Sequence, residues 1–482
     1  MTRNTDWLDA ALGPLRNAPA SHTWPSANDM SRRATLRHRR RRVGLASGGA
    51  ALGLAAALLV AFVAIPGSGP QGNERTPVAL GVRSVAGPDG SVQLLASAAK
   101  VAAASPQSVS TLASSEQAFA LDLTRQELSS ASGTNVLLSP MSADVDLSML
   151  ELGASGQTEK QIAAALRSTG LSSEENAAAW KVLVSSELAA ESPGELTLAN
   201  SLWIKEHLQV EPGFLHAEAA AFGDDTYQAD FTSPSATDAI NAWVDRATAG
   251  RIPELFTLGE LLPTTVVVLA NALHLHAAWA NPHQFTSTTG SFVTAAGQNL
   301  SVPTLVATND QLDFGVTSSY QAVQVPYTNG RFAALVVEPT SATMTSWLST
   351  LTKKDLSTIV GSLSSGSVDL SMPALGLSSH PLLNTALSTM GMASAFQSAD
   401  LTPMLGPTLG TRVFVAQVQQ ADTLLVNRWG TDAAAATGTS IVPTSASAVH
   451  VLDFNHPYLF LIRDTKTGTI LFSSVVNNPT AS

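Results

Sequence analysis

The chain of 482 residues contains no cysteine and few charged residues. Without cysteine it has no disulfide bond, no thiolate nucleophile and no cysteine-ligated zinc site, so its stability must come from packing. Charged residues make up 13% of the chain and hydrophobic residues 45%, a composition that suits a large core and excludes a disordered chain. The net charge is −11, and an acidic surface is poorly suited to binding nucleic acid. The sequence therefore predicts a globular body that binds no nucleic acid.

Motifs of catalysis are also missing. The sequence has no Gly-x-Ser-x-Gly elbow, no His-Glu-x-x-His and no phosphate-binding loop. His274 and His276 alternate onto one face of a predicted strand, a spacing that could hold a metal. No carboxylate or third histidine lies close to them in sequence, which favours a structural pair instead. We predict that the chain is not an enzyme and needs no metal or cofactor.

One stretch near the N-terminus is long and apolar. Val43–Ile65 contains 23 residues without a charge, and as a helix it would span about 34 Å, enough to cross a bilayer. Residues 1–42 contain nine Arg and three Asp, a net charge of +6, which leaves −17 for the rest of the chain. The positive-inside rule places this basic arm in the cytoplasm and the rest outside. The sequence predicts a transmembrane signal-anchor helix; the alternative is a cleaved signal peptide, although no small-x-small cleavage site follows.

Residues 66–107 are rich in Gly, Pro, Ser and Ala and show no sustained hydrophobic period. This composition is typical of a flexible stalk. A Ser-x-x-Lys match, Ser97–Lys100, falls within it. Enzymes that use this spacing place it on a helix beside a deep pocket, so we interpret the match as chance.

From Ser108 onward, helical hydrophobic periods alternate with strand-like runs of β-branched and aromatic residues. Their irregular mixture indicates an α+β body around a large, mostly antiparallel sheet. The predicted helices include Glu116–Ser130, Thr158–Arg167, Ala236–Ala249 and His380–Met390, and the predicted strands are Thr264–His276, Ala322–Tyr327, Phe332–Glu338, Val368–Met372, Val413–Val426 and Tyr458–Ile462.

The segment Gly430–Thr437 reads GTDAAAAT and lies between a predicted strand and a polar loop. Four consecutive alanines favour a turn of helix, which is one interpretation. The other is a segment that later becomes a strand, because small side chains fit between two existing strands and alternate residues from Thr431 would face the core. No Pro occurs between Gly430 and Val442, so every amide there is available for new ladder bonds.

That segment resembles the hinge of the reactive-centre loop in the serpin family, which has Gly, then Thr or Ser, an acidic residue and a run of Ala and Thr. Six further motifs of the family occur in family order over about 370 residues, so the body is identified as a member of the serpin family. These motifs are Asn135–Ser142, Leu198–Trp203, Ile240–Ile252, Leu269–Trp279, Leu387–Phe396, and the C-terminal pair Phe454–Phe460 and Ile470–Pro479.

The resemblance implies the serpin fold, large mostly antiparallel sheets surrounded by helices, with an exposed loop that acts as bait. A serine protease that cuts the bait forms its acyl-enzyme, and the cut loop then inserts into the main sheet as an additional strand. Deacylation is lost because the distorted protease no longer holds its oxyanion hole in place. The hinge that would insert first is Gly430, Thr431, Asp432, Ala433, Ala434, Ala435, Ala436 and Thr437.

The resemblance also assigns supporting residues to the sheet. Asn271 with Ser139 and Ser142 would form the shutter, and Trp279 would mark the breach where insertion starts. Gln420 stands where many members have a shutter histidine, which is a departure from the family pattern.

The family's usual spacing from Gly430 places the scissile bond between Thr444 and Ser445, and a cut anywhere from Val442 to Ala446 remains open. A small or β-branched residue at the cut favours elastase-like or subtilisin-like proteases. No Arg or Lys occurs between Arg428 and Arg463, which argues against trypsin-like targets.

Three further residues depart from the family near the hinge: Arg428 and Trp429 stand where acidic residues are common, and Asp432 replaces the usual Glu. The small-residue core of the hinge is complete, so we predict an inhibitor of serine proteases. The alternative is a non-inhibitory serpin that acts as a binding or signalling module at the cell surface. The expected organisation is a cytoplasmic arm (1–42), a membrane anchor (43–65), a stalk (66–107) and a monomeric extracellular serpin domain (108–482) of a bacterial protein.

Overall fold

The computed structural model describes residues 82–86, 91–96, 103–131, 133–189, 196–223, 225–248, 250–281, 284–411, 413–432 and 449–481. The predicted arm and membrane span, residues 433–437 of the hinge and the predicted bond Thr444–Ser445 lie outside these ranges. No helix within the described ranges has both the length and the apolar character needed to cross a membrane.

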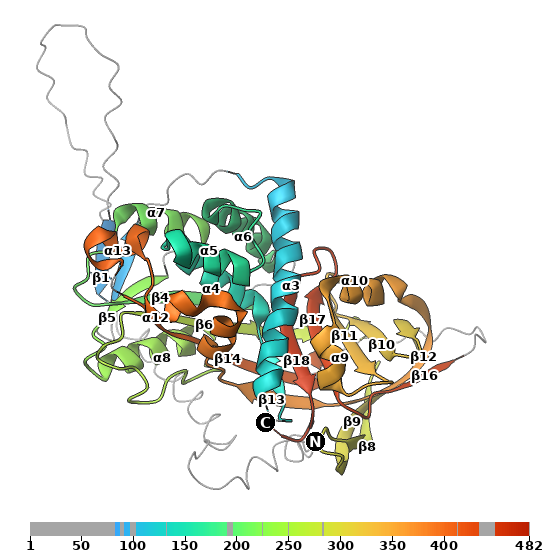
Figure 1. Cartoon of the computed structure of the whole chain (residues 1–482). Coiled ribbons are helices and arrows are strands. Elements are labelled where there is room, and N and C mark those ends of the chain that lie inside the picture. The colour runs from blue at the N-terminus through green and yellow to red at the C-terminus, as the bar shows by residue number, and fades with distance from the viewer. Residues whose placement is uncertain are drawn as a thin grey trace, which may run out of the picture. The chain divides into compact units, whose positions relative to one another are not determined.

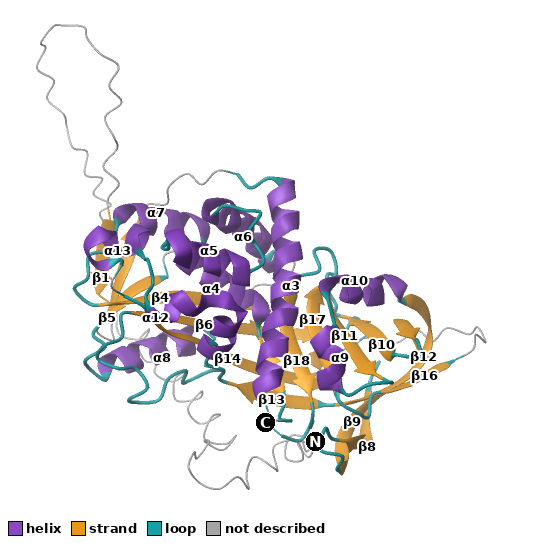
Figure 2. Ribbon diagram, viewed as in Figure 1, coloured by secondary structure: helices purple, strands orange, loops and turns teal. Residues whose placement is uncertain are grey.

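Two β-sheets form the centre of the described body, and helices pack around them (Figure 1). Figure 2 shows most of the helices gathered over the first sheet, and α9 and α10 beside the second. The first sheet follows the order β1 (Val82–Ala86), β2 (Val92–Ala96), β5 (Thr226–Ala229), β4 (Leu196–Lys205), β6 (Val267–Leu275), β14 (Val415–Asn427), β15 (Gly430–Thr431) and β7 (Ala277–Ala278), with β13 (Leu375–Ser379) paired to β14.

The second sheet follows the order β16 (His450–Asp453), β12 (Ser364–Pro373), β9 (Asn299–Val316), β10 (Tyr320–Pro326), β11 (Phe332–Pro339), β17 (Tyr458–Asp464), β18 (Ile470–Val476) and β3 (Val136–Leu138), with β8 (Thr286–Val293) paired to β9. Among the described strands only the pairs β4–β5, β6–β14 and β12–β16 are parallel. The predicted α+β fold with mostly antiparallel sheets is therefore confirmed.

The helices are α3 (Pro106–Ser130), α4 (Pro140–Leu152), α5 (Gly156–Ala165), α6 (Ser173–Leu188), α7 (Pro212–Ala221), α8 (Ser235–Ala247), α9 (Met344–Thr350), α10 (Lys353–Ser362), α11 (Asn384–Leu387), the π-helical turn η1 (Ser388–Met392), α12 (Ala393–Gln397) and α13 (Thr402–Leu409). Several begin at a side-chain cap. The Ser139 hydroxyl accepts a bond from the Ser142 amide at the start of α4, where Pro140 suits the first helical position.

Strand β6 lies in the middle of the first sheet, and all nine of its residues are buried. Its sequence is nearly all apolar because both faces are covered by helices. Ala270 and Ala272 pack with Ile240 and Trp243 of α8 on one face, while alternate residues such as Leu269 join the core on the other. Helix α4 contacts that second face.

The structure corrects the predicted stalk. Within residues 66–107, β1 and β2 form an antiparallel hairpin, and β2 pairs with β5 at Val92 and Gln93. Leu94 and Ala96 are buried in the main core, and α3 already begins at Pro106. The two strands have five residues each, so their strand pattern was hidden among the Gly, Pro and Ser residues that flank them.

The predicted helix His380–Met390 is wrong at its start. Leu382 forms an isolated bridge with Gln419 of β14, and the helix begins only at Asn384. Gly391 then takes a φ of +113°, which interrupts the helical path within η1. The apolar residues of this segment recur every 3.6 residues, which is typical of a helix. This pattern gives no sign that the segment before Asn384 pairs with β14.

Candidate functional site

The beginning of the predicted hinge already lies in the first sheet. Gly430 and Thr431 form the short strand β15, which pairs antiparallel with Asn427 and Val426 of β14 on one side. On the other side they pair antiparallel with Ala278 and Ala277 of β7. We call Gly430, Thr431 and Asp432 the hinge start. Its first two residues are thus inserted between two strands.

Gly430 is required by close packing. Its φ is +148°, and a Cβ atom placed there would lie 2.0 Å from the carbonyl oxygen of Ala277 and 2.7 Å from the Cα of Ala278. No side chain fits at these separations, because the two backbones approach directly. The family's glycine at this position therefore has a steric reason in this chain.

Thr431 points into the core and is 2% exposed. Its hydroxyl lies 2.6 Å from the hydroxyl of Tyr327. The Tyr327 ring stacks on the ring of Trp279 with 4.8 Å between the centroids and 8° between the planes. Trp279 donates from its indole nitrogen to the Asn427 carbonyl and from its amide to the Trp429 carbonyl. The predicted breach residue thus supports the hinge start directly.

Asp432 lies on the opposite side of the sheet, where it binds Arg251 and His274 and lies near His276. One carboxylate oxygen, Oδ2, accepts from Arg251 Nε at 2.9 Å and lies 2.7 Å from His274 Nε2 and 3.9 Å from His276 Nδ1. Burial acts to raise the pKa of Asp432, but the hydrogen bond and charge of His274 together with Arg251 hold that pKa below its usual value. The carboxylate is therefore ionised at neutral pH.

Below the hinge start, β6 and β14 pair directly with each other in parallel, from Val267 with Val415 to Leu273 with Asp422. We call this pairing the seam. A strand that extended β15 downward would enter between these two strands and would run antiparallel to both.

A buried hydrogen-bond network crosses the seam, and we call its members Ser139, Asp146, Asn200, Asn271 and Gln420 the seam network. The Gln420 amide nitrogen donates to Asn271 Oδ1 and to the Ser139 carbonyl, both at 2.8 Å, and Gln420 Oε1 accepts from the Ser139 amide. Asn271 and Asn200 in turn donate to the two oxygens of Asp146, at 2.8 and 2.6 Å. The network joins α4 to β4, β6 and β14.

Asp146 carries the charge of this network. Burial raises its pKa to about 7, although the hydrogen bonds from Asn271 and Asn200 act to lower it. The carboxyl group is fully buried, so its protonation near neutral pH changes the strength of the bonds that hold the seam.

Of the residues predicted for the shutter, the structure links Asn271 with Ser139 and places Ser142 beside them. Asn271 and Ser139 are joined through Gln420, and the Ser142 carbonyl accepts from Asn200. Within the described residues, however, the buried hydroxyl of Ser142 has no hydrogen-bond partner. Gln420, which departs from the family histidine, takes part in three of the network's bonds.

Sequence reasoning missed Asp146, Asn200 and the partners of Asp432. Asp146 lies four residues after Ser142, on the same face of α4, and this spacing was the available signal. The contact between His274 and Asp432 spans 158 positions and has no local signature.

The histidine pair lies beside Asp432, with His274 Nε2 at 2.7 Å and His276 Nδ1 at 3.9 Å from its Oδ2 atom. In the part of the chain that the structure describes, no group of three or more His, Cys, Asp or Glu could hold a metal ion.

Comparisons with known proteins point to one family. The family model described as "Serpin (serine protease inhibitor)" matches residues 114–479. Human Serpin I2 is 27% identical over 381 residues, which cover 75% of this chain and 90% of that protein. The solved structure of tengpin, a thermophilic serpin in the native state, superposes with a TM-score of 0.70 at 21% identity and covers 79% of this chain and 97% of that one. Human thyroxine-binding globulin, solved with its bound ligand, has a TM-score of 0.68 at 25% identity and covers 78% and 100%.

Proposed function

The chain belongs to the serpin family and is not an enzyme, and on that premise we propose that it inhibits serine endopeptidases by the suicide mechanism. The observation that carries the proposal is β15, in which Gly430 and Thr431 already lie between β14 and β7. The small residues that follow, Ala433–Thr437, would continue the same strand.

The protease takes the bait as a substrate. Its serine hydroxyl attacks the carbonyl carbon of the bait bond, which we place at Thr444 within the range Val442–Ala446. The bond to the Ser445 nitrogen then breaks, that nitrogen takes a proton, and an ester to the protease remains. The cut releases the hinge from its C-terminal tether, and about 15 residues after Gly430 become free to insert.

Insertion replaces the seam by two new ladders. The entering strand, roughly 50 Å long if fully extended, would pair antiparallel with both β6 and β14. The seam network must open first, because Gln420 and Asn271 bond directly across the path of the strand. The ester-linked protease would be carried along and distorted before water hydrolyses the ester.

The bait sequence favours elastase-like or subtilisin-like proteases. Thr444 and Ser445 are small, and shallow specificity pockets accept such residues. The absence of Arg and Lys between Arg428 and Arg463 argues against a protease with an acidic specificity pocket.

We place the inhibitor at the outer face of a bacterial cell membrane. Val43–Ile65 would anchor it and residues 1–42 would lie in the cytoplasm. The serpin domain would act as a monomer and form a covalent complex with its target, without a cofactor. Loss of the extracellular body, but not of the arm, on protease treatment of intact cells would support this orientation.

The test is formation of a covalent complex. Full-length chain is mixed with subtilisin or pancreatic elastase, and the products are separated in denaturing detergent gels. We expect a stable band at the summed mass of both proteins.

A variant of the hinge tests whether insertion is needed. Thr431→Arg places a charged side chain at a position where the native residue is only 2% exposed, so the strand could not insert there. We expect the protease to cut this variant as an ordinary substrate and to be released. Thr288→Arg, on the exposed face of β8, is the matched control and should trap normally. Unchanged trapping by Thr431→Arg would contradict the mechanism.

A second candidate is a non-inhibitory serpin that serves as a binding or signalling module. It is favoured by the altered flank of the hinge, where the Arg428 guanidinium lies over the Trp429 ring at 4.0 Å from its centroid. Thermal unfolding separates the two candidates. An inhibitor whose loop has been cut should melt far above the intact chain, because the loop has become a central strand, whereas a chain with a static loop should keep its melting temperature.

A further inference from the structure

Asp432 directly follows the two residues of β15. Gly430 and Thr431 before it are paired on both sides, and the Asp432 amide donates one more bond to the Leu425 carbonyl at 2.7 Å. The backbone of Asp432 then takes a φ of +47°. This left-handed conformation is uncommon for a residue other than glycine, and Asp and Asn tolerate it best. The turn of the backbone at Asp432 is therefore held by its surroundings.

The side chain of Asp432 fixes this turn to two other segments. Its Oδ2 atom receives Arg251 from the loop after α8 and His274 from β6. His274 is buried, whereas Arg251 and the Asp432 carboxylate are partly exposed. Hydrogen bonds to an ionised group are roughly twice as strong as neutral ones, so the Asp432 carboxylate adds strong contacts to the neutral bond between Thr431 and Tyr327.

We propose that Asp432 is a positioning residue that seats the hinge start in the sheet before any protease has cut the loop. Its carboxylate, held by Arg251 and His274, keeps Gly430 and Thr431 between β14 and β7. Without the carboxylate, the two residues leave the sheet and the gap between β14 and β7 opens. Only the last step, the link to the rate of protease trapping, rests on the proposed function.

The absence of cysteine from the chain allows a direct test of seating. Thr431→Cys introduces a single thiol at a position that is 2% exposed, and its rate of reaction with a maleimide reports how often the residue leaves the sheet. The rate is measured in the full-length chain with Asp432 and with Asp432→Asn. Asn keeps the tolerance for the left-handed backbone but removes the charge, so the comparison isolates the carboxylate.

We expect Asp432→Asn to raise the labelling rate at position 431 at least tenfold. Arg251→Gln should raise the rate in the same direction but by less, because His274 still binds the carboxylate. Adding Arg251→Gln to Asp432→Asn should change the rate little, because the charge that Arg251 binds is already gone. Asp245→Asn, which removes an equal charge from the end of α8, is the matched control and should leave the rate unchanged.

A reporter away from the hinge separates unseating from unfolding. Ser201→Cys, in a fully buried position of β4, should stay protected with Asp432→Asn. If its thiol reacts faster in parallel with the thiol at position 431, the whole sheet is opening and the anchoring role is wrong. A protected thiol at position 431 with Asp432→Asn would also overturn the proposal.

Trapping of protease gives a second, independent readout. Asp432→Asn should raise the number of inhibitor molecules consumed for each protease trapped several-fold, because insertion then begins from an unseated loop. If the thiol becomes exposed as expected while even the unmodified chain traps no protease, the proposed function fails and the seating role of Asp432 stands.

Discussion

The absence of a side chain at Gly430 allows β15 to fit between β14 and β7. Its φ of +148° and its close approach to the backbone of Ala277 and Ala278 leave no space for a methyl group. We expect Gly430→Ala to expel β15 and to destabilise the sheet by about 1–3 kcal/mol, as overpacking commonly does. Hydrogen exchange of a peptide covering residues 425–432 would report this as lost protection of the Asp432 amide. Gly376→Ala on β13 meets only Leu425 Cδ2 at 3.7 Å and should keep native protection.

Asn271 holds the seam through both ends of its amide. Replacing it with Ala leaves the Gln420 donor and one oxygen of Asp146 buried without this partner. Each such group costs about 1–3 kcal/mol, so we expect Asn271→Ala to lower the free energy of unfolding by about 3 kcal/mol. Urea unfolding measures this directly. Gln311→Ala on exposed β9 should change it by less than about 0.5 kcal/mol, and an equally small effect at Asn271 would show that the network is not stabilising.

At the residue scale, short sequence motifs that resemble those of the family pointed to Ser139, Asn271 and Trp279. It did not predict Asp146, Asn200 or the contact of Asp432 with His274. These depend on which face of a strand or helix turns inward and on a register between β4, β6 and β14 that no short segment encodes.

Elements were predicted best where one hydrophobic pattern extends over the whole element. The predicted strands Phe332–Glu338 and Tyr458–Ile462 match β11 and β17 to within two residues at each end. The hairpin β1–β2 was missed because five-residue strands among Gly and Pro resemble a linker in composition. Pairing with β5, which lies far along the chain, stabilises the hairpin.

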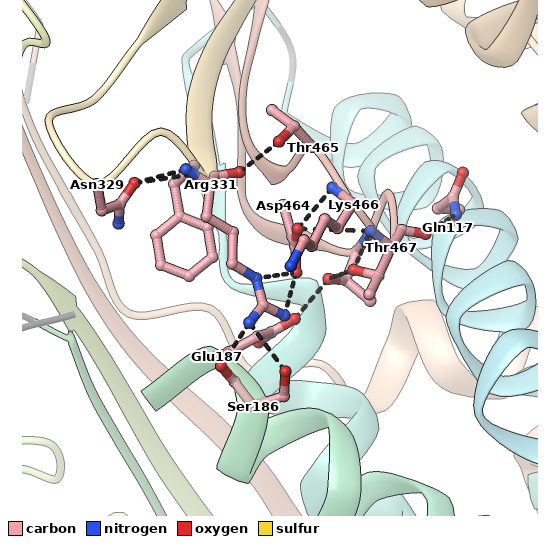
Figure 3. A network of polar contacts seen from close by, with 11 residues as sticks. Gln117, Ser186, Glu187, Asn329, Arg331, Asp464, Thr465, Lys466 and Thr467 are labelled. Atoms are coloured by element: carbon pink, nitrogen blue, oxygen red, sulfur yellow. Dashed lines mark hydrogen bonds and ion pairs between the residues drawn. The ribbon is translucent and has the colours of Figure 1, made fainter. Parts of the chain in front are cut away.

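A buried ion pair joins three elements at the end of the second sheet. Figure 3 shows Arg331, just before β11, pointing at Asp464 at the end of β17 and at Ser186 of α6. Two guanidinium nitrogens lie 2.8 and 2.5 Å from one Asp464 oxygen, and Asp464 is fully buried. Glu187 lies beside the pair and accepts from Thr469, and burial raises its pKa to about 8.

We expect Asp464→Asn to lower the free energy of unfolding by about 3–5 kcal/mol, because the Arg331 charge would stay largely buried without its counter-ion. Chemical unfolding of the full-length chain measures the change. Arg167→Gln removes a more exposed ion pair with Asp122 and should cost about 1 kcal/mol or less. A similar loss of unfolding free energy in the two variants would show that burial does not strengthen the contribution of the Arg331–Asp464 pair to stability.

At the scale of the whole molecule, buried acids give stability a dependence on pH. Burial raises the pKa of Asp144 to about 8 and of Asp146 to about 7, far above their values in an unfolded chain. Between pH 4 and pH 8 the folded state therefore binds more protons than the unfolded state, and the free energy of unfolding falls as pH rises.

We expect the chain to need more urea for unfolding at pH 5 than at pH 8.5. Asp144→Asn should flatten this dependence, because it removes one of the carboxyl groups that titrate in this range. The variant should still fold, because the Asn side chain can accept the bond from Trp180. Asp230→Asn is the control, because hydrogen bonds from Thr232 lower the pKa of Asp230, which stays ionised throughout this range. Stability that rises between pH 5 and pH 8.5 would contradict the expected direction.

The inserted position of Gly430 and Thr431 has a kinetic consequence. Starting a new strand is costly, because several dihedral angles are fixed before many bonds form, whereas lengthening an existing strand gains bonds with each residue added. In this molecule the first two residues of the new strand, Gly430 and Thr431, are already paired in the intact chain. Under the proposed mechanism, the structural change after a cut would be the lengthening of β15 from one end, and the separation of β6 from β14 would limit its rate.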